Sequence, residues 1–294
     1  MMMKKVINTL LMSGGGTKSI AYIGVLKKLE EMNTKIKIDV KTICGVSAGS
    51  IFGLVYTLKY TSEEMEKLLL NTKLEKLKNI KYINFFNKYG LDSGDKIIEW
   101  IDSMIINKGY DKNITFIELY NKTNIDFQVM TTNLNKYSSM KFNYINTPKV
   151  KVTDAIRMSI SIPFVFTYNT YLNDIHVDGS IIDNFPIKDF DDLSTTLGIK
   201  LINHGELDDH NVDEKINDME GYIYHILSCY IVQREMHVTR SDIYKNHVIF
   251  IDTEKISEMI NFSLPKESIK KLIDIGYNAS HEFFEKNDIE IEQI

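Results

Sequence analysis

The sequence predicts an α/β fold of three layers, in which a mostly parallel central sheet is flanked by helices. Two observations near the start of the chain lead to this prediction. Residues 6–12 and 40–44 are mostly apolar runs of strand length, and each leads through glycines into a helical pattern. The spacing of the two runs suits a β-α-β unit, whose right-handed crossover makes its strands parallel. The two glycine segments should therefore face one another across a crevice at one edge of the sheet.

The first glycine segment has the sequence SGGGTKS at residues 13–19. It is followed by apolar residues at helical spacing, namely Ile20, Ile23, Leu26, Leu29 and Met32. Three consecutive glycines expose backbone N–H groups that can bind an anion. The anion is either a phosphate or the oxyanion of an acyl-transfer intermediate.

Phosphate binding fits this segment less well than oxyanion binding. A Walker loop requires glycines where Met12 and Thr17 stand, and a dinucleotide-binding loop requires a glycine where Ser19 stands. Asp39 has a suitable spacing for a ribose contact, so nucleotide binding is kept as the weaker interpretation. The oxyanion interpretation also accounts for the second glycine segment.

The second glycine segment has the sequence GVSAG at residues 45–49, between the apolar run at 40–44 and a helical pattern at 50–58. A strand, a G-x-S-x-G turn and a helix in this order are typical of a nucleophile elbow. The turn is so tight that the serine backbone is strained and the flanking positions favour glycine. The hydroxyl of Ser47 should then stand beside a helix N-terminus and the N–H of Ala48, which can receive negative charge.

A catalytic serine needs a base, usually a histidine that a carboxylate orients. Seven histidines are present, and none lies in a local motif. A sharper candidate is Asp178, which follows an apparent strand at residues 170–177 and precedes a glycine. A carboxylate at the end of a strand should face the same crevice, although Asp-Gly pairs are also common in simple turns.

Taken together, these segments resemble the patatin-like phospholipase family. The family pattern is a G-G-G-x-[KR]-G loop, a G-x-S-x-G elbow and a D-G-[GA] segment. The chain matches this pattern at residues 14–18, 45–49 and 178–179, with further similar segments at 115–120, 131–134 and 155–163. The resemblance implies a three-layer patatin-like fold, with a catalytic core at residues 6–190 and an α/β extension of the same domain at 191–294.

The resemblance also implies roles for individual residues in a two-step lipid acyl hydrolase. Ser47 would be the nucleophile and Asp178 its base, as a dyad without histidine. The other implied residues are the oxyanion-hole donors Gly14, Gly15, Gly16 and Ala48, the elbow glycines Gly45 and Gly49, and Gly179 and Ser180 of the third motif. Lys18 would either tether the glycine loop or contact a lipid phosphate. Neither a cofactor nor a metal is implied, and the partner would be a lipid surface that supplies the substrate.

Two residues depart from the family pattern. Ser19 replaces the last glycine of the loop, and Ser180 replaces the usual Gly or Ala after Asp-Gly. Both are small, so the backbone path should be kept, with added strain if Ser19 requires a positive φ. The departures leave open a non-catalytic lipid-binding module on a degenerate patatin scaffold.

A second alternative is a Ser-His-Asp esterase of the α/β-hydrolase type, with a distant histidine such as His204 or His247. His176 lies two residues before Asp178 and should project from the same face of the strand. For His176, a hydrogen-bonding position beside the site is favoured over a catalytic one.

The composition suits one folded domain, because 294 residues with 44% hydrophobic and 26% charged residues can bury a large core. A net charge of −5 disfavours nucleic acid as a partner. The first residues resemble a secretory signal, but Asn8 and Thr9 interrupt the apolar run. No run approaches the ~20 apolar residues of a membrane span. A cytoplasmic protein with peripheral contact to membranes is therefore expected.

Two aromatic segments, at residues 80–89 and 164–168, are candidates for this peripheral contact because aromatic residues with lysines suit a headgroup boundary. A place in the core is the commoner alternative for aromatic clusters. Beyond residue 187 the pattern predicts strands at 195–202 and 248–251, a polar loop at 203–213, and helices at 216–231 and after Pro265. These helices are expected to cover the sheet, with a lid over an acyl channel as the alternative.

Overall fold

The first two predicted strands lie side by side in a sheet. β1 (Ile7–Met12) and β2 (Ile38–Val46) are parallel, and Met12 pairs with Gly45. The two glycine segments therefore begin at the same edge of the sheet, as the sequence predicts. The computed structural model of the protein describes residues 6–32, 38–202, 216, 219–253 and 262–287.

In the described part of the chain, the main sheet has the strand order β10-β9-β1-β2-β4-β8-β7, with β5 beside β4. The run from β10 to β4 is parallel, whereas β5, β7 and β8 pair in antiparallel fashion. The bounds of the other strands are β4 (Asp126–Asn133), β5 (Ser138–Phe142), β7 (Asn169–Tyr171), β8 (Asp174–Asp178), β9 (Thr196–Ile202) and β10 (Val248–Asp252). The sheet is thus mostly parallel.

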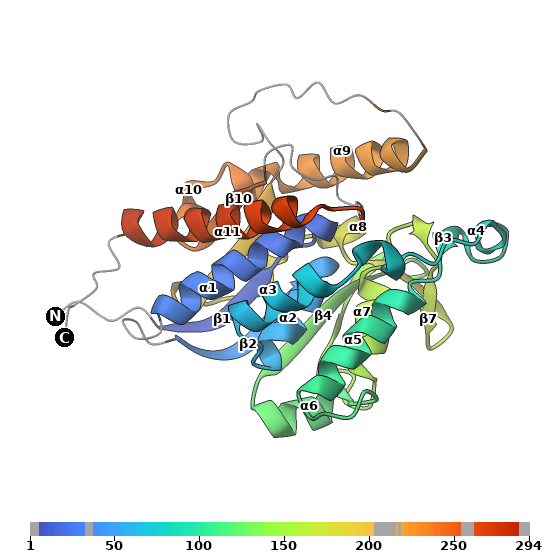
Figure 1. The fold of residues 1–294 in the computed structure, drawn as a ribbon, viewed down its shortest axis with the longest axis horizontal. Helices are drawn as coiled ribbons and strands as arrows, with labels where there is room; N and C mark the ends of the chain where they lie inside the picture. The colour runs from blue at the N-terminus through green and yellow to red at the C-terminus, as the bar shows by residue number, and fades with distance from the viewer. Residues whose placement is uncertain (1–5, 33–37, 203–215, 217–218, 254–261, 288–294) are drawn as a thin grey trace.

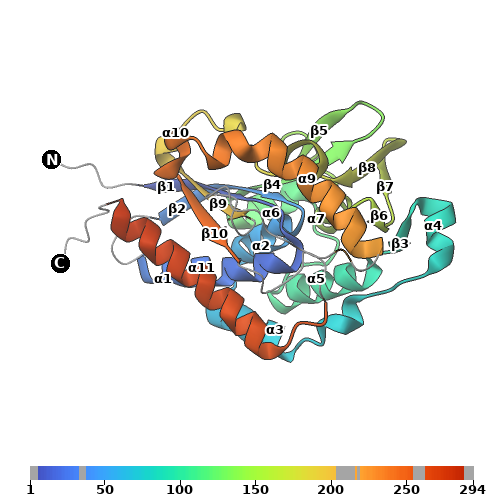
Figure 2. The ribbon, with the colours of Figure 1, turned by 90° about the horizontal axis from the view of Figure 1, so that it is seen from above.

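Two hydrophobic clusters pack on opposite faces of this sheet. Along β1, Leu10 and Met12 belong to the larger cluster and Leu11 to the smaller one, because successive side chains of a strand point to opposite faces. Helices that contribute to the larger cluster are α1 (Tyr22–Met32), α2 (Ala48–Thr57), α3 (Ser62–Asn71), α5 (Asp95–Asn107), α6 (Phe116–Thr123), α7 (Val152–Ser159) and α11 (Lys266–Lys286). The smaller cluster includes residues of η3 (Ile187–Asp189) and α9 (Met219–Thr239). Helices therefore cover both faces, which is the predicted three-layer architecture (Figures 1 and 2).

The predicted strand at residues 170–177 is wrong in one respect, because the chain turns back within it. Leu172 and Asn173 have positive φ angles of 49° and 68° and connect β7 to β8 as a hairpin. A two-residue turn with both φ angles positive matches the twist of the paired strands. β8 then runs antiparallel to β4, with Asp178 opposite Thr131. Asp178 thus enters the site from the direction opposite to that of β1 and β2.

The chain beyond residue 190 continues the main sheet. β9 pairs with β1, and β10 pairs with β9, so the predicted strands at 195–202 and 248–251 are confirmed. α11 begins after Pro265, as predicted, and packs along α1 (Figure 1). The predicted polar loop at 203–213 lies outside the described residues.

A small two-stranded sheet lies beside the main one and consists of β3 (Gly90–Asp92) and β6 (Phe164–Phe166). The helix before β3, α4 (Tyr82–Lys88), projects from one end of the molecule in both views (Figures 1 and 2). Among the helices that the structure describes, none combines the length and apolar character needed to cross a membrane.

Candidate active site

Ser47 stands at the turn between β2 and α2, with φ 51° and ψ −130°. Residues other than glycine rarely adopt such angles, and the strain costs on the order of 1–3 kcal/mol. Hydrogen bonds hold the turn on both sides. The N–H of Ser47 donates to the Oγ of Ser159 at 2.8 Å, and its carbonyl accepts from the Oγ of Ser50 at 2.6 Å. This is the tight strand-turn-helix arrangement that the sequence predicts.

Close packing explains the glycines on both sides of Ser47. A Cβ on Gly45 would lie 2.5 Å from the Cα of Ser50. A Cβ on Gly49 would lie 2.5 Å from the carbonyl oxygens of Met12 and Ser13. These neighbours are backbone atoms, so a larger residue would displace β1 or α2. The elbow glycines thus allow β1, β2 and α2 to meet at the serine.

The side chains of Ser47 and Asp178 meet although 131 positions separate them. The Oγ of Ser47 donates to the Oδ2 of Asp178 at 2.6 Å, and the Oδ1 of Asp178 accepts from the N–H of Ser180 at 2.9 Å. Asp178 is completely buried, and burial raises its pKa to about 6 even though both hydrogen bonds lower it. A carboxylate with this pKa can accept a proton near neutral pH.

Gly179 is the second residue of the predicted Asp-Gly motif. A Cβ at this position would lie 2.5 Å from the carbonyl oxygen of Met130, so the chain passes very close to β4 here. This close approach brings Asp178 against the elbow.

The two serines that depart from the family pattern cause no backbone strain. Neither Ser19 nor Ser180 has a positive φ, whereas Gly16 does, at 56°. Ser19 is fully buried in η1 (Gly16–Ala21), and Ser180 begins α8 (Ser180–Asp183). The backbone path at both positions is therefore compatible with serine.

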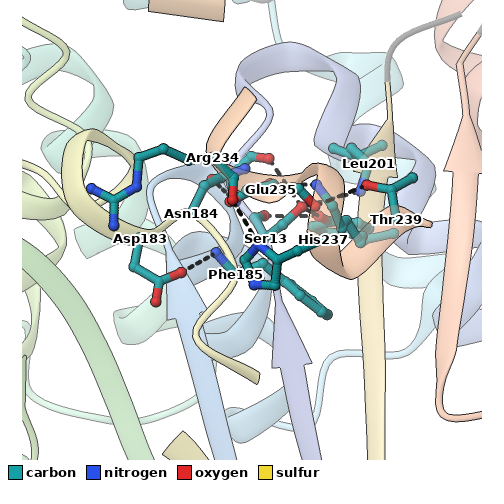
Figure 3. A network of polar contacts seen from close by, with 12 residues as sticks. Ser13, Asp183, Asn184, Phe185, Leu201, Arg234, Glu235, His237 and Thr239 are labelled. Atoms are coloured by element: carbon teal, nitrogen blue, oxygen red, sulfur yellow. Dashed lines mark hydrogen bonds and ion pairs between the residues drawn. The ribbon is translucent and has the colours of Figure 1, made fainter. Parts of the chain in front are cut away.

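Hydrogen bonds to distant segments hold the glycine loop (Figure 3). The N–H of Gly14 donates to the Oδ1 of Asn184 at 2.8 Å, and the Oγ of Ser13 accepts from the N–H of Leu201 at 3.1 Å. A Cβ on Gly14 would lie 2.9 Å from the Cβ of Ser47, so the loop passes directly beside the serine. Gly14 is a predicted oxyanion-hole residue, but its N–H is already engaged by Asn184.

Two other predicted oxyanion-hole residues line the cavity together with Ser47. Gly16 and Ala48 line the same cavity as Ser47, and their N–H groups donate to no acceptor among the residues that the structure describes. Ala48 is also the first residue of α2, so its N–H carries the partial positive charge of a helix N-terminus. Gly15, the fourth predicted donor, is extended and packs so closely on Leu201 that a Cβ would overlap that side chain. The role of these residues as oxyanion-hole donors stays a prediction.

Lys18 lies in η1 and is buried. Its backbone N–H donates to the carbonyl of Gly15 at 3.2 Å, which closes the glycine loop. Thr17 and Ile20 line the cavity beside Ser47, whereas Lys18 is not one of the described lining residues. Its predicted role as a loop tether or a phosphate contact stays a prediction.

An apolar cavity of about 110 Å³ opens beside Ser47. Besides Gly16, Thr17, Ser47 and Ala48, the lining is hydrophobic and consists of Ile20, Ile51, Phe52, Leu69, Leu74, Leu77, Ile97, Trp100, Ile160, Ile162, Phe166 and Phe262. A largely apolar pocket with a few convergent polar groups is typical of a ligand site. Its lining suits a hydrocarbon chain whose polar end reaches Ser47.

His176 does not lie between Ser47 and Asp178. It is buried on β8, its Nδ1 lies 2.9 Å from the Oγ1 of Thr131, and the rings of Phe142 and Tyr171 pack edge-on against it. Burial lowers the pKa of His176, which favours the neutral ring. His204, one of the two distant histidines that could complete a triad, lies outside the described residues. The hydroxyl of Ser47 donates directly to the carboxylate of Asp178, with no histidine between them.

The sequence did not single out two residues that position the site. Ser159 accepts from the N–H of Ser47 and donates to the carbonyl of Met130 at 2.6 Å, so it joins the elbow to β4. Its only sequence signal is its place in the family-like segment at 155–163. Asn184 holds Gly14 from 170 positions away, and no local motif marks it.

Comparison with known proteins places the chain in a family. A family model described as patatin-like phospholipase matches residues 10–191. An uncharacterised protein, R571, of Acanthamoeba polyphaga mimivirus is 30% identical over 278 residues, which is 93% of this chain and 92% of that protein. The probable lipid hydrolase 463L of Invertebrate iridescent virus 6 is 31% identical over 189 residues, which is 62% of this chain and 63% of that protein.

A solved structure shares the fold. VipD from Legionella pneumophila superposes with a TM-score of 0.64 at 16% identity, over 96% of this chain and 67% of the VipD chain. The family match covers more than half of the chain and includes the glycine loop, the elbow and the Asp-Gly segment. The chain is a member of the patatin-like phospholipase family, a family of serine ester hydrolases.

Proposed function

We propose that this protein is a lipid acyl hydrolase that cleaves fatty-acyl esters with Ser47 and Asp178 as a catalytic dyad. The proposal rests on one observation above the others, the 2.6 Å hydrogen bond from the Oγ of Ser47 to Asp178 at the wall of an apolar cavity. The family membership and the relative named as a probable lipid hydrolase support the same substrate class.

In the first step, the Oγ of Ser47 attacks the ester carbonyl carbon while Asp178 accepts the hydroxyl proton. The hydrogen bond already directs this proton to the Oδ2 of Asp178. The tetrahedral intermediate then breaks the bond to the alcohol part of the lipid, which leaves with a proton from Asp178. The fatty acyl group stays on Ser47 as an ester.

The negative charge of the tetrahedral intermediate needs hydrogen-bond donors. We assign this role to the N–H groups of Gly15, Gly16 and Ala48, of which Gly16 and Ala48 line the cavity beside Ser47. Gly14 instead positions the loop through Asn184. Each oxyanion donor of this kind contributes ~10²–10³ in rate.

In the second step, water attacks the acyl ester and Asp178 again accepts the proton. The acid is released and the proton returns to Ser47, so the dyad is restored. The apolar lining holds the acyl chain throughout, and burial there replaces its contact with water.

The two alternative functions have less support. A Ser-His-Asp triad requires a histidine between the serine and the carboxylate, but the two bond directly. Ser19 and Ser180 are the only basis for a non-catalytic module, yet neither has a positive φ, and the N–H of Ser180 donates to Asp178.

The activity should depend on pH through Asp178. Its carboxylate must be ionised to act as a base, and burial raises its pKa to about 6. We expect kcat/KM on a soluble ester to rise with pH through about 6 and then reach a plateau. A rate that is flat from pH 5 to pH 8, roughly one unit below and two above this pKa, would contradict the assignment.

The raised pKa of Asp178 has the opposite effect on stability, because the free energy of unfolding falls as the pH rises. Between the ordinary pKa of 3.8 and about 6, the folded state binds more protons than the unfolded state. The contribution of Asp178 to the free energy of unfolding is therefore present below pH 3.8 and is lost as the pH rises through about 6. Denaturant titrations over this range, compared with the Asp178→Asn variant, would isolate it.

Asn184→Ala should lower kcat by ~10-fold with a smaller change in KM. The substitution removes the acceptor for the Gly14 N–H, so the loop that carries Gly15 and Gly16 loses its fixed position. Steady-state kinetics and a thermal melt should be compared with those of Asn113→Ala, which alters an exposed asparagine. An unchanged kcat in a folded Asn184→Ala protein would show that Asn184 does not position the loop.

The proposed function is tested by incubating the purified protein with a mixed panel of phospholipids, lysolipids and neutral lipids. Mass spectrometry should show release of free fatty acid and loss of one lipid class. Absence of any acyl release across the panel and from short-chain esters, with protein of intact fold, would refute the proposal.

A further inference from the structure

Helix α4 and its flanks expose an unusual number of large hydrophobic side chains. Ile80, Tyr82, Ile83, Phe86 and Tyr89 are 47–77% exposed, and no residue of α4 is buried. Single exposed hydrophobic residues are common on proteins, but a contiguous group of them marks an interaction surface. The core alternative for this segment is therefore wrong.

A further aromatic residue extends this surface. Phe164 is 47% exposed and lies on β6, where it pairs with Gly90 at the start of β3. We call α4 together with Ile80, Tyr89 and Phe164 the α4 arm. Of the second aromatic segment that the sequence offers for contact with lipid, 164–168, only Phe164 belongs to the arm. Val165, Phe166 and Thr167 are buried, so the core alternative holds for most of that segment.

The charge around the arm is positive although the chain is acidic. Residues 73–89 contain five lysines and one glutamate, against a net charge of −5 for the whole sequence. Lysines near an anionic membrane surface strengthen binding to it. Aromatic side chains together with lysines suit the boundary between headgroups and acyl chains.

The arm is held to the body of the protein. The N–H of Lys81 donates to the carbonyl of Leu91 at 2.8 Å, and the rings of Tyr89 and Tyr168 lie 5.8 Å apart between centroids. The N–H of Asn79 also donates to the buried Asp92. The exposed side chains are thus presented on a positioned helix at one end of the molecule (Figures 1 and 2).

The segments that carry the arm also contribute to the lining of the cavity beside Ser47. Leu74 and Leu77, in the segment that leads into α4, line the cavity, and so does Phe166, two residues after Phe164. An acyl chain that leaves a lipid layer at the arm would meet this hydrophobic lining on its way to Ser47. A protein partner would not require such a link between the arm and the cavity lining.

From these observations we propose that the α4 arm docks the protein on an anionic lipid surface and feeds acyl chains to the cavity. This proposal rests on the proposed function, because docking would bring the enzyme to its lipid substrate. Vesicle binding can nevertheless be measured without catalysis. The arm contacts the lipid surface itself, with its aromatic side chains inserted at headgroup depth and with Lys81 and Lys88 near the phosphates.

The test is sedimentation with vesicles of about three parts phosphatidylcholine to one part phosphatidylserine, with pure phosphatidylcholine vesicles for comparison. The wild type should bind the anionic vesicles, and binding should weaken at high salt. Tyr82→Ser with Phe86→Ser should reduce binding at least ~10-fold, because two large apolar side chains no longer insert. Lys81→Gln with Lys88→Gln should reduce binding to the anionic vesicles by ~10-fold.

The matched control is Ile106→Ser with Ile243→Ser, which changes two exposed hydrophobic residues outside the arm, on α5 and α10 (Asp242–Lys245). α10 lies toward the end of the molecule opposite to α4 in both views (Figures 1 and 2). The control should bind like the wild type, and all variants should keep their activity on a soluble short-chain ester. Equal binding of wild type and both arm variants would overturn the proposal. The proposal would also be overturned if the wild type bound no vesicles but self-associated, and if the arm variants abolished this self-association.

Failure of docking and failure of the proposed function give different results. A protein that hydrolyses soluble esters but ignores vesicles overturns the docking and keeps the function. A protein that binds vesicles through the arm but hydrolyses no ester keeps the docking as a surface property and overturns the function.

Discussion

Ser47→Ala is expected to lower kcat by a factor on the order of 10⁶, to the level of background hydrolysis. The substitution removes the nucleophile and leaves Asp178 with no hydroxyl to deprotonate. Hydrolysis of a soluble ester and release of fatty acid from lipid should both be measured, with circular dichroism to establish folding. Alanine keeps the small size that the elbow requires, so the fold should be retained.

The control for this experiment is Ser103→Ala, which removes an exposed hydroxyl on α5 whose bond is to its own helix. It should behave as the wild type. Substantial activity in a folded Ser47→Ala protein would mean that another group attacks the ester.

Asp178→Asn is expected to lower kcat by ~10²–10⁴, the usual contribution of a positioned base. The rise in rate through pH 6 should vanish with it, since the group that titrates there is gone. The variant should be at least as stable as the wild type above pH 6, because it no longer buries an ionised carboxylate. Loss of activity without loss of stability would separate a catalytic role from a structural one.

Asp183→Asn is the matched control, because burial raises the pKa of this neighbouring carboxyl as well. Asparagine keeps the oxygen that accepts from the N–H of Phe185, and Asp183 makes no hydrogen bond to Ser47. The control should keep its activity and its pH profile. A fully active Asp178→Asn protein with an unchanged pH profile would favour a different base, such as His204 in a triad.

The parts of the site that could be predicted from the sequence are those built by local chain geometry. Glycines at 14–16, 45 and 49 follow apolar runs, and such runs become neighbouring parallel strands that bring their ends together. The placement of the glycine loop beside Ser47 follows from this one β-α-β unit.

The approach of Asp178 could not be derived in this way. A turn at Leu172 and Asn173 reverses the chain, and β8 pairs with β4 in antiparallel fashion. Turns of this kind usually contain Asn-Gly or Asp-Gly, and Leu-Asn gives little signal. The position of Asp178 at a strand end suggests that it faces the same crevice as Ser47, but only the resemblance to a known family predicts that the two act directly as a dyad.

The sequence does not reveal the residues that hold the site from distant segments, for a related reason. Asn184 and Ser159 act through single hydrogen bonds to backbone atoms of distant segments. Their residue types are ordinary, and what distinguishes them is their position in the folded chain. The α4 arm was ambiguous for another reason, since an aromatic and lysine-rich segment can be buried or exposed, and only the exposed fractions of its side chains decide between the two.

The most direct measurement of the central claim is covalent labelling with an alkyl fluorophosphonate, followed by peptide mapping. A serine whose proton is taken by Asp178 beside an oxyanion hole should be phosphonylated once per chain, on Ser47. The label should be absent in Ser47→Ala and strongly slowed in Asp178→Asn. Ester hydrolysis by wild-type protein that takes up no label at Ser47, or equally fast labelling of Ser47 in Asp178→Asn, would contradict the dyad.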